Sequence, residues 1–329
     1  MNTSAFRLPP SAFGIAAAAM LALSSAAGAA DSYPSRPVRV VVPFTPGTGM
    51  DIIARNVGPK LSERVGQPVV IDNRPGASGN LGAEVVARAA PDGYTVMVSG
   101  NPLVTSPHLY GNVPFKPLTD FAPISLAAWG TLILVTHPSA RIGSLSELVA
   151  RAKSSPGKIS YGSPGIGTPH HMSMELLKDR TGADLLHVPY KGTAGAFTDL
   201  LGGQIQVMFI PIHVGMQFVK GGKLRALAVG SGKRHPAATD LPTLQELGIR
   251  GADVDMWYGF LAPRGTPRAV VGRLDQELRA ILEAPDLKAA FDAQGMQAAS
   301  STPAEFAALM KREDARWGEI IRKNNIRAE

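Results

Sequence analysis

Short apolar runs rich in β-branched residues alternate along this chain with segments whose apolar residues recur at helical spacing. The runs at 38–44 (VRVVVPF) and 67–72 (QPVVID) have the length and composition of buried strands. Each is followed by a glycine-bearing loop and then by a helix-like segment, the first at about 52–65 with Asp51 as its expected N-cap. Repeated strand–loop–helix units favour an α/β fold with parallel strands covered by helices on both faces.

Two long extended runs, 123–139 and 256–263, interrupt this alternation. They predict a double crossover between two α/β units, with a cleft between the units. After the second run the pattern predicts only helices, at about 267–283, 285–294 and 303–322. We therefore expect two lobes, one formed by residues 31–128 together with 257–329 and the other by residues 129–256.

The same local device occurs four times: a strand ends, a glycine-bearing loop follows, and a helix begins. The four loops are FTPGTGMD (44–51), RPGASGN (74–80), GSPGIGT (162–168) and YKGTAGA (190–196). Ligands of open α/β sheets bind beyond the carboxyl ends of the strands, where helix N-termini present unpaired N–H groups and a partial positive charge. Four such ends facing one cleft would bind an anion without any charged side chain.

The N-terminus has the pattern of a secretory signal peptide over residues 1–30. Its apolar core spans 11–27, and small residues around Ala29 and Ala30 place the expected cleavage there. The alternative, a membrane anchor, is disfavoured because the apolar run is shorter than the ~20 residues that a bilayer requires. The chain has no cysteine, which excludes disulfides and fits an exported, periplasmic protein.

Charge and motifs narrow the function further. The net charge of +7 comes from Lys and Arg that are spread along the chain, which is not the clustered pattern of nucleic-acid-binding proteins. His170, His171 and Glu175 could begin a metal site, but a third protein ligand is not evident and HExxH is absent. GxSxG and GxGxxG are absent too. We expect no metal, no cofactor and no catalysis, with an exported His-dependent or metal-dependent enzyme as the alternative.

Several stretches, in this order, resemble one family across essentially the whole mature chain. They are YPSRPVRVVVPFTPGTGMDIIAR, GQPVVIDNRPGASGNLGAE, PDGYTVMV, ISYGSPGIGTPHHM, VPYKGTAGAFTDLLGGQIQVMF, LPTLQELG and WYGFLAPRGTP. The chain resembles the Bug family, the periplasmic receptors of tripartite tricarboxylate transporters. The resemblance implies a two-lobe type II periplasmic-binding-protein fold that closes like a flytrap on a small carboxylate, either a di- or tricarboxylate or an aromatic or aliphatic monocarboxylate. The implied partners are the membrane subunits of such a transporter, and a membrane sensor kinase is a further candidate.

The resemblance and the loops together nominate ligand-binding residues, partly through backbone amides and bridging waters. The candidates are Phe44, Thr45, Gly47, Thr48, Gly49, Met50, Asp51, Ala77, Ser78, Ser99, Asn101, Ser163, Gly165, Gly167, Thr168, His170, Tyr190, Lys191 and Gly192. Met50 stands where the family often has a hydroxyl, and Ile210 stands where an aspartate is frequent. Both departures predict a less polar pocket, argue against amino-acid ligands and favour an aromatic or aliphatic carboxylate.

Overall fold

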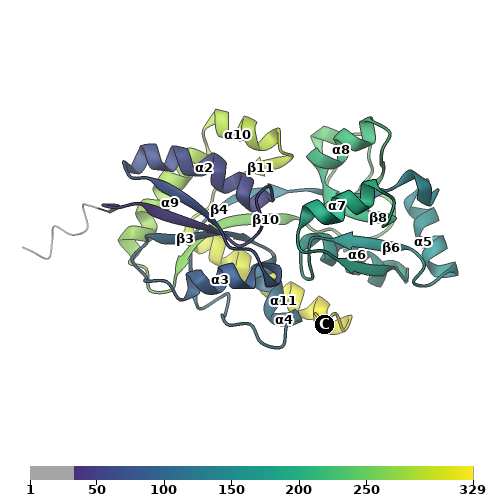
Figure 1. Cartoon of the computed structure of the whole chain (residues 1–329), viewed down its shortest axis with the longest axis horizontal. Coiled ribbons are helices and arrows are strands. Elements are labelled where there is room, and N and C mark those ends of the chain that lie inside the picture. Colours follow the sequence, from purple (N-terminus) through teal and green to yellow (C-terminus); the bar gives the residue numbers. More distant parts are fainter. Residues whose placement is uncertain (1–32, 329) are drawn as a thin grey trace, which may run out of the picture.

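A computed structural model describes residues 33–328, and the predicted signal peptide and its cleavage site lie outside this range. The described chain folds around two β-sheets, each covered by helices (Figure 1). We call the six-stranded sheet with its helices lobe one and the five-stranded sheet with its helices lobe two. The predicted α/β class is confirmed.

Lobe one contains the first and the last parts of the described chain. Its strands follow the order β11-β4-β10-β3-β1-β2. They are β1 (Val38–Val42), β2 (Val69–Asn73), β3 (Thr95–Gly100), β4 (Phe121–Gly130), β10 (Met256–Pro263) and β11 (Met296–Ala298). Its helices are α2 (Gly49–Val65), α3 (Asn80–Ala87), α4 (Pro102–Leu109), α9 (Arg268–Leu282), α10 (Pro285–Asp292) and α11 (Pro303–Lys323), with a 3₁₀ turn at Ala77–Gly79.

Lobe two is formed by the middle of the chain. Its strands follow the order β7-β6-β8-β5-β9. They are β5 (Leu132–Thr136), β6 (Ser160–Ser163), β7 (Leu186–Pro189), β8 (Val207–Pro211) and β9 (Arg225–Val229). Its helices are α5 (Leu145–Ser154), α6 (Pro169–Thr181), α7 (Thr193–Leu201) and α8 (Ile212–Lys220), with 3₁₀ turns at Pro138–Ala140 and Pro236–Ala238.

The two sheets are mixed, whereas the strand–loop–helix pattern predicts parallel ones. The strand β10 runs antiparallel to β3 and β4, and β5 runs antiparallel to β8 and β9. The extended run at 123–139 is therefore two strands, one in each sheet, joined at Thr131. A strand that enters a sheet from the hinge must run away from the hinge. Its direction is therefore opposite to that of the strands that end at the cleft. The crossovers thus impose the antiparallel direction.

Three local expectations are corrected by the structure. A short strand, β11, follows α10 where only helices were expected, and it pairs with β4. The helices α4 and α8 were missed, because α4 contains Pro107 and α8 starts directly after β8 with no glycine loop. Asp51 is not the N-cap of α2: the cap is Thr48, and Asp51 lies in the first turn.

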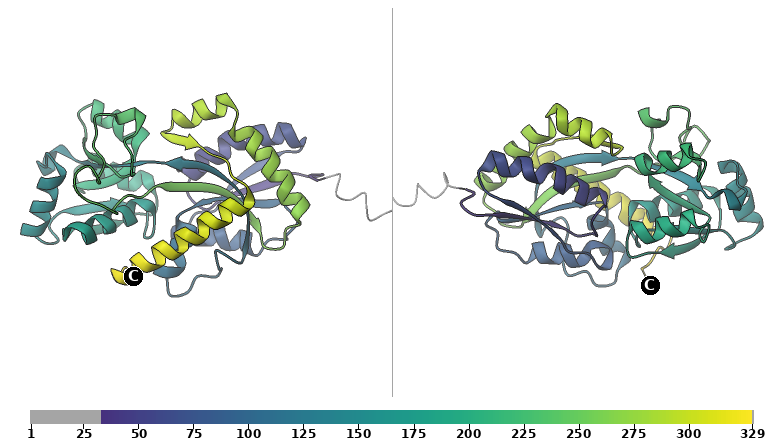
Figure 2. Two further views of the ribbon diagram at one scale, coloured as in Figure 1. Left: turned by 180° about the vertical axis from the view of Figure 1, so that it is seen from behind. Right: turned by 45° about the horizontal axis from the view of Figure 1, so that its top comes forward.

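The C-terminal helix α11 completes lobe one by packing across the sheet (Figure 2). Phe306 and Trp257 are fully buried and their rings meet edge to face, with centroids 5.5 Å apart. A Cβ on Gly259 would lie 2.2 Å from the Phe306 ring, so only glycine lets the helix approach β10 this closely. The C-terminal helix α11 is thereby held against the sheet that the first strands of the described chain begin.

The start of α11 allows a first test of the fold. The Thr302 side chain accepts the N–H of Glu305, and the Glu305 side chain accepts the N–H of Thr302, which makes a complete capping box. We expect Thr302→Ala to lower the free energy of unfolding by about 1 kcal/mol in urea titrations. Ser300→Ala, next to the cap but outside it, is the control. Equal stability of the two variants would contradict a stabilising cap.

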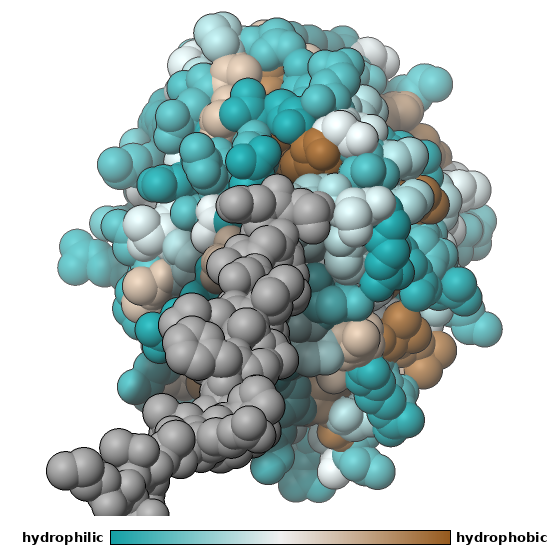
Figure 3. Space-filling view, turned by 90° about the vertical axis from the view of Figure 1, so that its left-hand side faces the viewer, coloured by the Kyte–Doolittle hydropathy of each residue, from teal (hydrophilic) through white to brown (hydrophobic). Residues whose placement is uncertain are grey.

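The helices and one face of the described part of the chain can be examined for apolar surface. None of the helices within residues 33–328 combines the length and apolarity that crossing a bilayer takes. Figure 3 shows the end of lobe one that faces away from lobe two. That face is mostly hydrophilic, with hydrophobic residues scattered over it in small groups, which is ordinary for a folded domain.

Candidate functional site

The four glycine loops meet between the two lobes. The β1–α2 and β2–α3 loops of lobe one and the β6–α6 and β7–α7 loops of lobe two line a shared cavity of about 650 Å³, which we call the loop cavity. Six predicted residues besides Phe44 line it: Thr45, Ala77, Ser78, Gly165, Tyr190 and Lys191. Lys191 is the one charged residue among the described residues that line this cavity.

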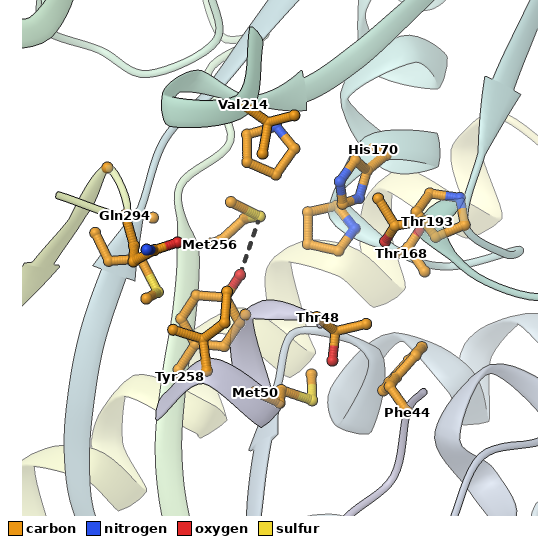
Figure 4. Close-up of a pocket in the computed structure, with 18 of the residues that line it drawn as sticks. Phe44, Thr48, Met50, Thr168, His170, Thr193, Val214, Met256, Tyr258 and Gln294 are labelled. Atoms are coloured by element: carbon orange, nitrogen blue, oxygen red, sulfur yellow. Dashed lines mark hydrogen bonds between the residues drawn. The ribbon is translucent and has the colours of Figure 1, made fainter. Parts of the chain in front are cut away.

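A second, smaller cavity of about 100 Å³ lies beside the hinge and shares Phe44 and Pro164 with the first. We call it the hinge cavity, because Gly130, Thr131 and Met256 of the crossover segments line it. The predicted residues that line it are Phe44, Gly47, Thr48, Gly49, Met50, Asn101, Thr168 and His170. Figure 4 shows Thr48 and Met50 on the lobe-one side, facing His170 and Val214 on the lobe-two side.

Three helices begin at the hinge cavity: α2 with Gly49 and Met50, α6 with Thr168 and His170, and α8 just after Pro211. The first helical bond of α2 is donated by Ile52 to Thr48, at 2.9 Å. The first of α6 is donated by Met172 to Thr168, also at 2.9 Å. The N–H groups of Gly49 and Met50 in α2 and of His170 in α6 precede these bonds and have no acceptor within their own helices, and all three residues line the cavity. Helix starts from both lobes make this a site for an acceptor with negative charge.

Five predicted residues do not line either cavity: Asp51, Ser99, Ser163, Gly167 and Gly192. The buried Asp51 carboxylate instead accepts hydrogen bonds from Arg55 and from the N–H of Gly47, both at 2.9 Å, and from Asn73 at 3.0 Å. Burial alone would raise the pKa of Asp51, but these hydrogen bonds outweigh it and lower the pKa. Asp51 therefore holds the β1–α2 loop in place through these hydrogen bonds and lines neither cavity.

Ser163 and His171 support the β6–α6 loop in the same way. The Ser163 hydroxyl lies 2.7 Å from Nε2 of His187, and Nδ1 of His171 accepts the N–H of Gly167 at 3.1 Å. The rings of His171 and His187 are stacked, with centroids 4.2 Å apart. Burial lowers the pKa of both histidines to about 3, so both rings are neutral near pH 7.

His170, the neighbour of His171, turns to the hinge cavity instead (Figure 4). Its two ring nitrogens are buried, and neither has a hydrogen-bond partner within residues 33–328. Burial lowers the pKa of His170 to about 3, so this imidazole is neutral as well. The two adjacent histidines therefore differ: His171 is bonded to the loop, whereas His170 lines the cavity and its buried ring nitrogens have no partner among the described residues.

Asn101 lines the hinge cavity, but its side chain is hydrogen-bonded to the backbone of the crossover segment that leads into β10. Its Oδ1 accepts the N–H of Trp257 at 3.1 Å and its Nδ2 donates to the carbonyl of Asp255 at 3.3 Å. We expect Asn101→Ala to lower the free energy of unfolding by about 1–3 kcal/mol, because the buried Trp257 N–H loses its acceptor. Urea denaturation checks this, with the half-buried Asn56, whose side chain bonds to Ile52 of its own helix, replaced by alanine as control.

The lobes touch directly around these cavities. The Thr105 hydroxyl of α4 donates to the carbonyl of Gly167 at 2.8 Å, and Lys323 of α11 lies 3.6 Å from the carboxylate of Asp179 in α6. A Cβ on Gly295 in lobe one would lie 3.0 Å from the backbone nitrogen of His213 in α8. The structure is thus one in which the two lobes are in contact.

Apart from Asn101 and His170, the sequence did not reveal the hinge-cavity residues that lie outside the glycine loops. Those missed on the crossover strand and the C-terminal segment are Met256, Tyr258, Gln294, Gly295 and Met296, and those missed at the start of α8 are Pro211, His213 and Val214. No loop signature marks them. The signal available for α8 is a strand, VMFIP, that ends directly at a helix start and so at the same sheet edge as the loops.

The residues proposed for a metal-dependent enzyme do not form a metal site. His171 Nε2 lies 4.0 Å from the Glu175 carboxylate, which is already bonded to Lys178 and Tyr161. Within residues 33–328, no three His, Asp or Glu side chains gather closely enough to hold an ion. His170 stands alone at the cavity rather than in a ligand set.

Comparison with known proteins places the chain. The model of the family described as "Tripartite tricarboxylate transporter family receptor" matches residues 53–326. A Pseudomonas sp. P51 protein, "UPF0065 protein in tcbD-tcbE intergenic region", is 39% identical and the match covers 95% of this chain and 93% of that protein. Protein BugT of Bordetella pertussis is 34% identical, with 91% and 92% covered.

Solved structures agree with this placement. The periplasmic binding protein BugD is 35% identical, with a TM-score of 0.83 over 90% of this chain and 100% of that one. Rhodopseudomonas palustris Rpa4515 with adipate is 33% identical, with a TM-score of 0.84 over 89% and 98%. MatC from the same species, with bound malate, is 30% identical, with a TM-score of 0.81 over 88% and 100%.

These matches confirm the two-lobe periplasmic-binding-protein fold and exclude the enzyme alternative. The chain belongs to the tripartite tricarboxylate transporter receptor family, the Bug family, and is a periplasmic solute-binding receptor.

Proposed function

We propose that this receptor captures a small organic carboxylate between its lobes and delivers it to the membrane subunits of a tripartite tricarboxylate transporter. One observation carries the proposal: helix starts from both lobes meet at the hinge cavity. Among the described residues that line this cavity there is no Asp, Glu, Lys or Arg. Leftover backbone N–H groups, rather than charged side chains, would hold the carboxylate.

The chemistry of the cavity also indicates what the ligand lacks. An ammonium group would need a carboxylate partner, and none lines the hinge cavity among the described residues. Met50, Ile52 and Phe44 give an apolar wall. The ligand is therefore a carboxylate with an apolar body rather than an amino acid, as Met50 also predicts. Ile210, in contrast, is fully buried in the core of lobe two and lines neither cavity, so the expectation that it makes the pocket less polar is not supported.

Closure follows from differential contact. A ligand bonded to helix starts of both lobes stabilises the closed form over the open one. The moving units would be residues 31–128 with 257–329 and residues 129–256. Charge-assisted hydrogen bonds contribute about 1.5–3 kcal/mol each, so a few of them are compatible with micromolar or tighter binding after ordering costs. Lys191, in the loop cavity, would favour the approach of an anion.

The test is a thermal-shift screen of the purified mature protein against carboxylates, matched amino acids and matched amines, followed by calorimetry. We expect at least one carboxylate to raise Tm and bind with a Kd in the micromolar range or below, and its amine analogue to do neither. A screen in which no carboxylate binds would overturn the proposal. Uptake of the bound acid by vesicles that contain the transporter subunits, with and without the receptor, tests delivery.

The export step is tested separately. We propose cleavage near Ala29 and Ala30, and N-terminal sequencing of protein recovered from the periplasm should begin at about residue 30 or 31. A mature protein that retains residues 11–27 would contradict the signal-peptide prediction and support the anchor instead. A sensor kinase as a further partner stays a prediction.

A further inference from the structure

A third cavity, of about 890 Å³, lies in lobe two and shares no lining residue with the hinge cavity or the loop cavity. It is bounded by the connection from β5 to α5, the end of α8, the start of β9 and the 3₁₀ turn at Pro236–Ala238 (Figure 1). The helix α8 begins at the hinge cavity with His213 and ends at this one with Lys220. Its nine residues span roughly 13 Å. We call this cavity the distal groove, and a molecule bound there does not occupy the space between the lobes.

The floor of the distal groove is apolar. Ile142, Leu224 and Ala238 line it and are buried. Met216 and Val219 of α8 also line it and are half-buried. Because none of these five side chains protrudes from the surface, a flat surface such as a bilayer does not reach them. The floor is therefore accessible only to a molecule that enters the groove.

Three basic side chains, those of Arg141, Lys220 and Arg225, line the same groove. All three residues are exposed, and none of the ion pairs formed within residues 33–328 includes them. Nη1 of Arg225 lies 3.1 Å from the position that a Cβ of Gly143 would take, so this guanidinium is seated against the backbone of the β5–α5 connection. Cations without a carboxylate partner at the edge of an apolar floor attract an anion.

Arg151, which does not line the groove, neutralises one of its carboxylates and fixes its edge. The Arg151 guanidinium pairs with Glu147, one of the two carboxylates in the lining, and Asp240 is the other. The same guanidinium donates to the carbonyls of Ala140 at 2.9 Å and Arg141 at 2.7 Å. These bonds hold Arg141 at φ +52°, where a residue other than glycine is uncommon. A fixed turn therefore keeps Arg141 at the groove.

The size and the edges of the groove favour a small molecule over a protein segment. Its volume lies within the range of about 300–1,000 Å³ that is usual for small-molecule pockets. An added peptide strand is disfavoured at β9, because a bulge interrupts its pairing with β5 between Leu134 and Val135. Farther along β9, Val229 is already bonded to Pro242 and Leu244. A small inorganic anion would leave the apolar floor uncovered, so the matching ligand combines an anionic group with an apolar body.

We propose that the distal groove of lobe two binds a small amphiphilic anion, whose charged group contacts the three basic side chains and whose apolar part lies on the groove floor. This inference goes beyond the proposed function, because the groove is separate from the cavities between the lobes. The site involves no chemical step. It gives the receptor a second ligand of a class different from its solute.

The experiment uses octyl sulfate as the probe, with controls that each change one of its features. In 1-octanol the charge is removed, in octylammonium it is reversed, and in inorganic sulfate the chain is removed. Calorimetry on the purified mature protein measures the four affinities. We expect octyl sulfate to bind with a submillimolar Kd and each control to bind at least tenfold more weakly.

Two substitutions test the contact with the charged group. Lys220→Gln and Arg225→Gln should each weaken octyl sulfate binding at least threefold, and the double variant at least tenfold. Both residues are exposed, so neither change removes a buried contact. Lys223→Gln is the matched control, since Lys223 is exposed in the same turn between α8 and β9 but does not line the groove. Its affinity should equal that of the wild type.

Hydrogen exchange locates the bound probe. Octyl sulfate should slow amide exchange in residues 138–147 and 216–226, and leave residues 44–50 and 162–168 unchanged. Protection of those two interlobe loops instead, equal binding of 1-octanol, a double variant that binds like the wild type, or no binding of octyl sulfate would each overturn the distal site. Sedimentation with phosphatidylglycerol vesicles that depends on Lys220 and Arg225, without binding of octyl sulfate, would assign the groove to membrane lipid instead. No readout here involves the solute between the lobes, so failure of this inference leaves the proposed function standing.

Discussion

Gly167→Ala is expected to lower the affinity for the tightest-binding carboxylate about 10- to 100-fold, equivalent to about 1.4–3 kcal/mol. Gly167 has φ +79°, and a Cβ there would lie 2.5 Å from Cδ1 of Leu109 and 3.1 Å from Oγ1 of Thr105. Both neighbours belong to α4 in lobe one, whereas Gly167 belongs to lobe two. The added methyl group would therefore separate the lobes where they touch, and would disturb the Thr105 hydrogen bond.

The matched control is Gly157→Ala. Gly157 also lies in lobe two and has φ +68°, but a Cβ there meets nothing within 4 Å. Both substitutions impose the backbone strain of an alanine at positive φ, and both should lower stability by about 1 kcal/mol. Only Gly167→Ala should weaken binding. Small-angle scattering with saturating ligand should show a larger radius for Gly167→Ala than for the control. Equal affinities of the two variants would contradict an interlobe contact at Gly167.

Acid should destabilise the protein through its buried histidines. Burial lowers the pKa of His170, His171 and His187 from 6.5 to about 3 in the folded state. Between pH 6.5 and pH 3 the unfolded chain therefore binds more protons at these sites than the folded chain does. The free energy of unfolding therefore has its full value, with respect to these rings, above pH 6.5. It decreases as the pH falls from 6.5 toward 3. At pH 5 the loss is about 2 kcal/mol for each fully buried histidine.

Urea denaturation of the ligand-free protein at pH 7.5 and pH 5 measures this effect. His170→Leu is the informative variant, because both ring nitrogens of His170 lack partners and the replacement leaves no hydrogen bond broken. Its loss of stability between the two pH values should be about 2 kcal/mol smaller than that of the wild type. A wild-type-like pH dependence of His170→Leu would show that His170 titrates normally in the folded protein.

The sequence alone was sufficient for the elements whose signals are local. Strand β1 is a run of valines bounded by prolines, and its composition is enough to place it. The glycine loops were found because the turn from strand to helix needs particular backbone angles, as at Gly165 and Gly167, which have φ of 152° and 79°. Such requirements act within a few residues, so they can be read along the chain.

The pairing and direction of the crossover strands could not be predicted from local patterns. The run at 123–139 is mostly apolar on both sides of Thr131, and its periodicity does not mark Thr131 as the point where the chain leaves one sheet for the other. The antiparallel direction of β5 and β10 follows from which lobe each strand enters, and that depends on contacts between distant segments. Periodicity reports burial, and it does not report the partner that causes the burial.

Within the site, local sequence patterns predicted the glycine loops, the presence of helices α2 and α6 after two of them, and an apolar contribution from Met50, although α2 begins three residues earlier than expected. Which side chains line the cavities depends on contacts between segments that are distant in the sequence. The tertiary structure turned His171 into a support for the loop and left His170 at the cavity without a partner among the described residues. It also brought α8 and Met296 to the same cavity from positions far apart in sequence. The physical reason is that backbone geometry is set by neighbours along the chain, whereas the lining of a cavity is set by packing between the lobes.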